Sequence, residues 1–403
     1  MLQEKRILVG VTGSIAAYKA CDLVQRLKEK GAAVRVVMTH SATRIIHPNA
    51  LAALTGSAVI QDAWEDVGHG AMPHIEMARW TDAFVIAPCT AHTLAELSMG
   101  LTGSAVSMTA LAYQGPLIVA PAMNTVMLES APVQEHLQRL TEGGVSVLST
   151  ASGDLACGEV GEGKLITPEE ITSYVDLVLG FARKIPNLSG KKVLISGGHT
   201  EEPLDGVRFL SNRSSGKTAI AIARAFRVAG AQVHLVLGIA DEVPPDGIKV
   251  TRVQTSREFQ DVLKKNQKVS DAIIMAAAIA DFIPGETGNG KWKDSRAMKN
   301  LELQPAPNIL SELGESKPKG QILVGFALET DSPVENALDK LKKRNCDFVV
   351  VNTPLSQPGQ GFGADAVKAA ILSAKSSNAK LKNTEKNQLA VDLVRSIAEV
   401  WKS

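Results

Sequence analysis

The sequence contains little cysteine, and its few cysteines are not arranged as a metal site. Cys21, Cys89, Cys157 and Cys346 lie far apart and form no CxxC pair or Cys/His cluster. This spacing argues against a structural zinc site. Scattered thiols in a chain of this length are typical of a reducing compartment, so we expect a cytoplasmic location.

The sequence also lacks an excess of either charge and any long apolar run. Lysine and arginine number 43 against 42 aspartate and glutamate residues, a formal net charge of +1. This balance argues against nucleic acid or a membrane surface as a partner. No apolar run could span a bilayer, and the glycine-interrupted start, MLQEKRILVGVTGSIAAYKA, does not fit a signal peptide.

Aromatic residues make up only 4% of the chain, whereas apolar residues make up 45%. Alanine, valine and leucine must therefore fill the cores. A length of 403 residues predicts two domains of ordinary size.

A new domain is expected to begin in mid-chain, after a Pro/Gly/Ser-containing linker over 183–190. The apolar run Val193–Ile195 predicts a buried strand, and Gly197-Gly198 a turn. Residues 211–217, SNRSSGK, then open an alanine-rich helix. The GxxxxGK[ST] spacing of a Walker A loop is absent. Hydroxyls, a glycine and a lysine at a helix start favour a phosphate site, and a capped helix after a long loop is the plain alternative.

The first half begins with a predicted βαβ unit. Its parts are a strand over Ile7–Val11, a helix over Ala16–Lys30 and a strand over Val34–Met38. Glycines and a serine at 10–14 leave room for a ligand beside the first helix. The second strand ends in hydroxyls at 39–41 rather than an acidic residue, which favours phosphate over a ribose diol. An ordinary tight turn is the alternative.

Two further short strands are predicted over Phe84–Pro88 and Leu117–Pro121. Thr90 and Asn124 follow them, and ligands of open α/β sheets bind at the carboxyl ends of strands. His74 stands near a helix start, where a lone histidine is more often structural than catalytic. Cys157 lies in a loop bounded by glycines, an unusual place for a structural cysteine.

The first half resembles the phosphopantothenoylcysteine decarboxylase family of flavoproteins. The segments that carry the resemblance are GVTGSIAAYK (10–19), His74-Ile75, APCTA (87–91), Pro121-Ala122-Met123-Asn124 and LACG (155–158). The resemblance implies FMN as cofactor and an assembly built from trimers, with flavin between subunits. It makes His74 the acid/base group of oxidative decarboxylation. Asn124 would bind the substrate carboxylate or amide, and Cys157 would donate the proton in the final reduction.

The same resemblance implies a set of FMN contacts. They are Gly13, Ser14, Thr39, Ser41, Thr90 and Ser107. One segment departs from the family, which usually has paired Asn/Asp residues before the helix that contains Ser107. Here the sequence is Leu101-Thr102-Gly103-Ser104.

The second half resembles phosphopantothenate–cysteine ligase, and the whole chain resembles the bacterial bifunctional family that fuses both enzymes. The matching segments are TEEPLDGVRFLSNRSSGK (200–217), AAAIADF (276–282), KWK (291–293), GFALET (325–330) and VNTPLSQPGQGFGAD (351–365). The resemblance implies activation of 4′-phosphopantothenate by CTP, with Mg²⁺, and capture of the acyl cytidylate by cysteine. Asn212 would position that intermediate, and Lys291 would neutralise phosphate charge. No residue is assigned as a metal ligand.

The nucleotide contacts implied by this resemblance share one site. They are Met275, Ala276, Ala277, Asp281, Lys291, Phe326, Lys340 and Arg344. Several positions depart from the family, among them Thr218-Ala219, which follow Lys217 where the family has Met-Gly. Glu201 stands where arginine is frequent, Arg344 replaces a frequent lysine, and the Lys-x-Pro-Asp segment reads PAPN at 305–308.

These features together predict an α/β protein with two doubly wound, Rossmann-like domains. Residues 1–182 would form a flavodoxin-like decarboxylase domain, and residues 191–403 a ligase domain that supplies its substrate. The expected partners are small molecules and further copies of the chain. Two alternatives stay open: a flavoprotein of other chemistry, such as a flavin prenyltransferase, and a non-catalytic regulatory relative.

Overall fold

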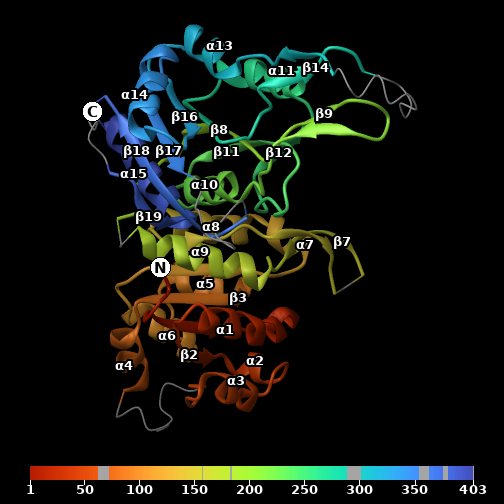
Figure 1. The fold of residues 1–403 in the computed structure, drawn as a ribbon. Coiled ribbons are helices and arrows are strands. Elements are labelled where there is room, and N and C mark those ends of the chain that lie inside the picture. Colours follow the sequence, from red (N-terminus) through yellow and green to blue (C-terminus); the bar gives the residue numbers. More distant parts are fainter. Residues whose placement is uncertain are drawn as a thin grey trace. The chain divides into compact units, whose positions relative to one another are not determined.

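A computed structural model describes residues 1–61, 72–156, 158–181, 184–287, 301–353, 363–374 and 380–402. The chain divides into two compact units, Met1–Ile185 and Pro186–Ser403. They run from red to yellow and from green to blue in Figure 1. The division falls inside the segment 183–190 that the sequence suggests as a linker.

The N-terminal unit is built on a five-stranded parallel sheet in the order β2-β1-β3-β4-β5. The strands are β1 (Arg6–Val11), β2 (Ala33–Met38), β3 (Ala83–Cys89), β4 (Leu117–Pro121) and β5 (Ser146–Val147). An order of 2-1-3-4-5 is that of the flavodoxin-like sheet, which confirms the predicted fold. A separate antiparallel hairpin joins β6 (Ala151–Asp154) to β7 (Val160–Lys164).

Helices pack on this sheet in two groups. One group contains α1 (Ala20–Glu29), α3 (Pro48–Thr55) and α9 (Pro168–Gly180); the other contains α4 (Pro73–Trp80), α5 (Ala91–Met99), α6 (Ala105–Ala112) and α8 (Ala131–Glu142). Two short helices, α2 (His40–Thr43) and α7 (Thr125–Glu129), follow β2 and β4. Strand residues Leu8, Phe84 and Ile86 meet Leu94 and Val106 of the second group in the core.

The helix predicted over 16–30 is two elements rather than one. A 3₁₀ turn, η1 (Ile15–Lys19), precedes α1. The Ser14 hydroxyl accepts a hydrogen bond from the Ala16 N–H at 3.4 Å, and the Ala20 N–H bonds back three residues to Ala17. These short-range bonds tighten the first turn before the α-helix begins.

The C-terminal unit contains an eight-stranded sheet in the order β12-β11-β8-β13-β16-β17-β18-β19. Its strands are β8 (Lys192–Gly197), β11 (Gln232–Leu237), β12 (Lys249–Arg252), β13 (Ala272–Met275), β16 (Ile322–Leu328), β17 (Phe348–Thr353), β18 (Ala366–Ser373) and β19 (Lys382–Glu385). The six strands from β12 to β17 are parallel and follow the order 3-2-1-4-5-6 of a Rossmann sheet. The last two strands are antiparallel.

The helices of this unit are α10 (Lys217–Val228), α11 (Ser256–Gln267), α13 (Ile309–Glu315), α14 (Pro333–Lys343) and α15 (Lys386–Lys402). Two small hairpins, β9 (Glu201–Pro203) with β10 (Phe209–Ser211) and β14 (Phe282–Pro284) with β15 (Leu303–Pro305), lie outside the main sheet. Strand β13 ends at Met275. Beyond it, the N–H groups of Ala277 and Ala278 bond to Ser196 and Gly198.

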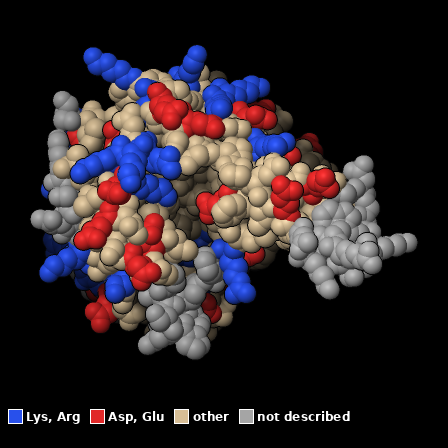
Figure 2. All heavy atoms as spheres, turned by 45° about the horizontal axis from the view of Figure 1, so that its top comes forward, with Lys and Arg blue, Asp and Glu red and all other residues tan. Residues whose placement is uncertain are grey.

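The even charge balance of the sequence is visible on the surface of the protein. On the face drawn in Figure 2, basic and acidic side chains are interspersed. Across the described residues, no helix combines the length and the apolar character that crossing a membrane requires.

Gly198 shapes the turn that follows β8. Its φ is +75°, and an added Cβ would lie 2.5 Å from the Ile239 carbonyl oxygen. Gly320 has a similar φ of +85°, but nothing lies within 4 Å of its added Cβ. Alanine substitutions at the two positions therefore distinguish the cost of backbone strain from the cost of steric overlap.

We expect Gly320→Ala to cost about 1–2 kcal/mol of stability through the left-handed backbone alone. Gly198→Ala should cost about 2–5 kcal/mol because overlap adds to that strain. Urea unfolding of the two variants measures the difference. Equal losses would show that the turn can shift away from Ile239.

Candidate active sites

In the N-terminal unit, a buried hydroxyl ties together the carboxyl ends of β1 and β3. Thr12 Oγ1 donates to the Pro88 carbonyl at 2.8 Å and accepts from the Thr90 N–H at 3.1 Å. The order of the sheet reverses between these two strands, and ligands bind at such a switch point. Thr90 is therefore fixed at the expected place. Thr12 itself was not among the predicted site residues.

Four of the predicted flavin contacts gather beside this point. An ideal Cβ built on Gly13 would lie 2.5 Å from the Ser41 Cβ, so the two turns touch. Ser14 and Thr39 each accept a backbone N–H, from Ala16 at 3.4 Å and from Ala42 at 3.3 Å. Because each hydroxyl acts there as an acceptor, its own proton can be donated to an anion.

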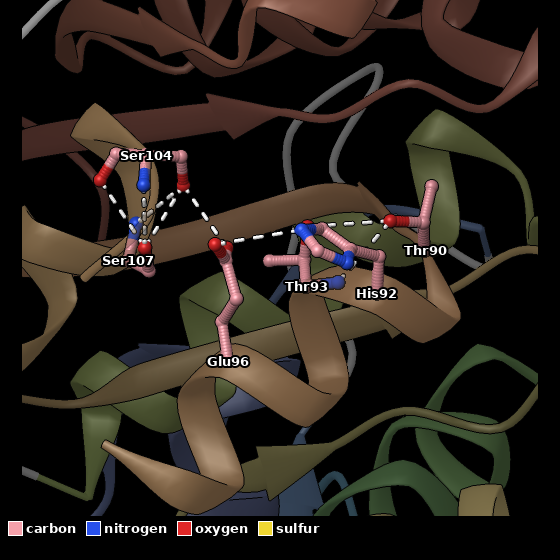
Figure 3. A network of polar contacts seen from close by, with 6 residues as sticks. All are labelled: Thr90, His92, Thr93, Glu96, Ser104 and Ser107. Atoms are coloured by element: carbon pink, nitrogen blue, oxygen red, sulfur yellow. Dashed lines mark hydrogen bonds and ion pairs between the residues drawn. The ribbon is translucent and has the colours of Figure 1, made fainter. Parts of the chain in front are cut away.

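The other two predicted flavin contacts cap helices. Thr90 Oγ1 accepts from the Thr93 N–H at 3.3 Å at the start of α5. Ser107 is buried and exchanges hydrogen bonds with Ser104 in a capping box that opens α6 (Figure 3). Its hydroxyl donates to the Ser104 carbonyl at 3.1 Å. A flavin contact by Ser107 stays a prediction.

Asn124 is held by two elements at once. Its Oδ1 accepts from the Val126 N–H at 2.8 Å at the start of α7, and its Nδ2 donates to Glu159 at 2.7 Å. The β6–β7 hairpin also docks on this segment, because the Met123 N–H donates to the Gly163 carbonyl at 3.0 Å. Residues 152–154, predicted as part of the loop around Cys157, belong instead to strand β6. Cys157 lies outside the described residues, between β6 and β7.

His74 lies in the first turn of α4. Its Nδ1 is buried and has no hydrogen-bond partner among the described residues. In Figure 1, α4 and α7 stand at opposite ends of the N-terminal unit.

In the C-terminal unit, two adjoining cavities are lined by residues that follow β13, which is one of the two strands at the switch point of this sheet. Their volumes are about 730 Å³ and about 550 Å³. Both are lined by Ala277, Ile279, Asp281, Phe326 and Lys340. Asn212 and Ala276 line the larger cavity, which we call the front cavity, and Met275 and Arg344 line the smaller, rear cavity. Lys291 lies outside the described residues.

Ser196 in β8 repeats the role of Thr12. Its hydroxyl lies 3.5 Å from the Ile274 carbonyl and accepts from the Ala277 N–H at 3.2 Å. The first strand of each sheet is thus linked by a hydroxyl to the strand across the switch point.

Lys340 stands on the wall shared by the two cavities. Its Nζ donates to the Phe326 carbonyl at 2.6 Å. Burial lowers its pKa, with smaller opposing effects from Cys346 and nearby carboxylates. A desolvated cation at this point would attract the phosphates of a nucleotide strongly.

The loop before α10 lines the front cavity and is fixed from two sides. Asn212 Nδ2 donates to the Ile279 carbonyl at 3.2 Å. His199 Nδ1 lies 2.7 Å from the Ser214 carbonyl and must be the donor, because a carbonyl only accepts. His199 was not among the predicted site residues.

Two lysines also line the front cavity. Lys217 pairs with Asp365 at 2.8 Å and with Glu242 at 4.0 Å, and the hydrogen bond to Asp365 raises its pKa. Lys386, the first residue of α15, has a lowered pKa because of burial and then the nearby charge of Lys217. The two lysines thus bring positive charge to the front cavity, partly balanced by Asp365 and Glu242.

The 305–308 segment lines the rear cavity with Arg344. Asn308 Oδ1 accepts from the Ser311 N–H at 3.2 Å and from the Ser311 hydroxyl at 2.9 Å. Arg344 donates to the same hydroxyl. Within the described residues, no group of three or more His, Cys, Asp or Glu side chains could hold a metal.

Comparison with known proteins covers both units. A family model described as "Flavoprotein" matches residues 1–180, and one described as "DNA/pantothenate metabolism flavoprotein C-terminal domain" matches residues 188–400. The "Coenzyme A biosynthesis bifunctional protein CoaBC" of Haemophilus influenzae is 37% identical over 399 residues, 99% of this chain and 98% of the relative. The Bacillus subtilis protein of the same name is 35% identical over 403 residues, 100% of this chain and 98% of the relative.

The chain belongs to the CoaBC family. Membership confirms the resemblance of both halves and argues against a flavoprotein of other chemistry. Solved structures related to the two halves are also similar. A C-terminal domain of CoaBC is 28% identical, covering 54% of this chain and 98% of that chain, with a TM-score of 0.44. A mutant PPC decarboxylase "complexed with pantothenoylaminoethenethiol" is 32% identical, covering 44% of this chain and 99% of that chain, with a TM-score of 0.40.

Three of the four cysteines of this chain are poor nucleophiles. Burial raises the pKa of Cys21 and Cys89 and raises that of Cys346 to about 11. The thiolate is the reactive form, so these residues should alkylate slowly. We expect iodoacetamide at pH 8 to label Cys157 about tenfold faster or more, as measured by mass spectrometry of peptides. Preferential labelling of Cys346 would contradict its burial.

Proposed function

We propose that the protein makes 4′-phosphopantetheine from 4′-phosphopantothenate and cysteine in the cytoplasm. Residues 191–403 would join the substrates at the expense of CTP, and residues 1–182 would decarboxylate the product with FMN. One observation carries the proposal. The two cavities of the C-terminal unit together are lined by Asn212 and by all seven described residues that the sequence predicts for CTP.

In the ligation, a carboxylate oxygen of 4′-phosphopantothenate attacks the α-phosphorus of CTP and pyrophosphate leaves. The cysteine amine then attacks the acyl carbon, CMP leaves, and the amine loses a proton. Lys340, between the cavities, and Lys291 would stabilise the charge that develops on the phosphates. Mg²⁺ usually binds one or two carboxylates together with substrate phosphates, and Asp281 is positioned to supply one.

The shared wall separates the two substrates in this proposal. Met275, Arg344 and the 305–308 segment would surround the nucleoside in the rear cavity. The acyl substrate would occupy the front cavity, with its carboxylate near Asn212. Its 4′-phosphate would then meet Lys217 and Lys386, which also line that cavity.

The N-terminal residues fit a flavin mononucleotide. The hydroxyls of Ser14 and Thr39 can donate to its phosphate, and the close contact of Gly13 with Ser41 leaves no space for a side chain there. Bound flavin would accept two electrons from the substrate thiol and return them after carbon dioxide has left. Asn124 would orient the substrate, His74 would move the proton in the oxidative step, and Cys157 would protonate the enethiol.

We also propose that this site forms between copies of the chain, in a trimer-based assembly. The separation of α4 from α7 in Figure 1 supports this, because in such an assembly α4 of one copy could meet α7 of another. The buried, unpartnered Nδ1 of His74 is a polar atom for which a ligand or another subunit could supply the partner.

Variants of the two proposed proton-transfer residues should stop the decarboxylation reaction at different stages. His74→Asn should prevent carbon dioxide release, because the acid/base group of the oxidative step is lost. Cys157→Ser should still release carbon dioxide but accumulate the oxidised enethiol. The serine hydroxyl is a weaker acid than the thiol and cannot supply the proton that completes the reduction. Single-turnover assays with carboxyl-labelled substrate separate these outcomes. If both variants stall before carbon dioxide leaves, the division of roles is wrong.

The phosphate end of the front cavity can be tested with a shortened substrate. Lys386→Met should raise the KM for 4′-phosphopantothenate about 10- to 100-fold. This is the loss of affinity expected when one hydrogen bond between charged groups is removed. The kcat/KM for pantothenate, which lacks the phosphate, should not change. Pyrophosphate release measures both, and Lys382→Met on the exposed strand β19 is the control. An equal loss with both substrates would place the 4′-phosphate elsewhere.

A further inference from the structure

Helix α5 carries a buried carboxylate that the proposed chemistry does not use. The Glu96 side chain is 6% accessible, and its Oε2 accepts from the Ser104 hydroxyl at 3.1 Å. Its Oε1 lies 3.5 Å from Nε2 of His92, whose side chain is 83% accessible. Over the described part of the chain, no lysine or arginine pairs with it. Buried charges without a strong partner are costly, so this placement needs a reason.

The loop before α6 is shaped around this carboxylate. A Cβ added to Gly103 would lie 2.5 Å from Glu96 Oε1 and 3.7 Å from its Cδ, with nothing else within 4 Å. The backbone of Gly103 is not left-handed, so it could otherwise carry a side chain. A side chain at position 103 would therefore have to displace the Glu96 carboxylate, whereas the backbone of the turn would accept it.

The carboxylate also fixes the direction of the hydrogen bonds that open α6 (Figure 3). An ionised carboxylate only accepts, so the Ser104 hydroxyl must give it its single proton. Ser104 Oγ can then only accept, and it receives the Ser107 N–H at 3.2 Å. The Ser107 hydroxyl in turn accepts the Ser104 N–H at 3.1 Å. Glu96 thus fixes the Ser104 hydroxyl as an acceptor within the capping box.

This capping box lies next to the switch point of the N-terminal sheet. Val106, one residue before Ser107, would be 3.3 Å from a Cβ on Gly10 of β1. Helix α5 begins at Thr90, which bonds to Thr12 at the end of β1. Glu96 therefore connects the two helices that flank the proposed flavin site.

We propose that Glu96 is a positioning residue for flavin binding. From α5 it supplies the carboxylate that the 101–104 loop lacks, and it holds the first turn of α6 against β1. This inference rests on the proposed FMN function of the N-terminal unit. The loop that departs from the family pattern is thus compensated by a residue from the preceding helix.

The first test replaces the carboxylate by an amide of the same size. Glu96→Gln should weaken FMN binding to the apoprotein about tenfold, the effect of losing one hydrogen bond to a charged group. Fluorescence titration gives the dissociation constant, and the melting temperature of the apoprotein is measured in parallel. The control, Glu142→Gln, makes the same chemical change at an exposed position on α8.

The second test moves the carboxylate back to the loop. Gly103→Asp alone should weaken FMN binding more than tenfold, because its Cβ collides with Glu96 and brings a second carboxylate close. The double variant Glu96→Ala/Gly103→Asp should return to within about threefold of wild type, because one carboxylate again caps α6. If Gly103→Asp does not fold, Gly103→Ala with and without Glu96→Ala tests the same collision.

The outcomes distinguish a failure of this inference from a failure of the proposed FMN function on which it rests. Unchanged FMN affinity in Glu96→Gln, or losses that simply add in the double variant, would overturn the positioning role while leaving the flavin site intact. A wild-type protein that takes up no FMN would defeat the proposed function and this inference together. Rescue by the relocated carboxylate is the result we expect, and a merely structural role would not produce it.

Discussion

Both sites depend on the topology of a parallel sheet, in which a ligand can bind where the winding of the chain reverses. At that place the crossovers leave toward opposite faces, so the carboxyl ends of two neighbouring strands are not covered by a helix. Here a hydroxyl bridges the strands in each unit, Thr12 between β1 and β3 and Ser196 between β8 and β13. These bridges hold the backbone ends of the neighbouring strands together. The predicted ligand contacts gather around both.

The two units arrange this space for different chemistry. The N-terminal unit surrounds its switch point with small residues and hydroxyls such as Gly13 and Ser14, which suits a cofactor that itself carries the electrons. The C-terminal unit instead places lysines on the cavity walls, with Lys340 partly desolvated between two compartments. Partly desolvated lysines are expected where an enzyme stabilises negative charge that develops on phosphates. The same winding thus supports both the redox site and the nucleotidyl-transfer site that we propose.

Local patterns in the sequence predicted most of the parallel strands and the doubly wound fold of both units. Short apolar runs mark buried parallel strands whatever lies beside them, and the motifs at their ends place Thr90 and Asn124. Long-range contacts were not predictable in this way. Glu96 and Gly103 depend on each other across a helix, and Lys386 reaches its cavity only through the antiparallel return of β18 and β19. The 3₁₀ turn at 15–19 was missed because its periodicity resembles that of a helix.

The central claim is that one chain carries both activities in sequence. The most direct measurement gives the protein 4′-phosphopantothenate, CTP and carboxyl-labelled cysteine, and follows labelled carbon dioxide and CMP together. The account predicts one carbon dioxide for each CMP with flavin bound, and CMP without carbon dioxide once flavin is removed. Carbon dioxide released without CTP, or label retained in the acyl product of the flavin-loaded protein, would contradict it.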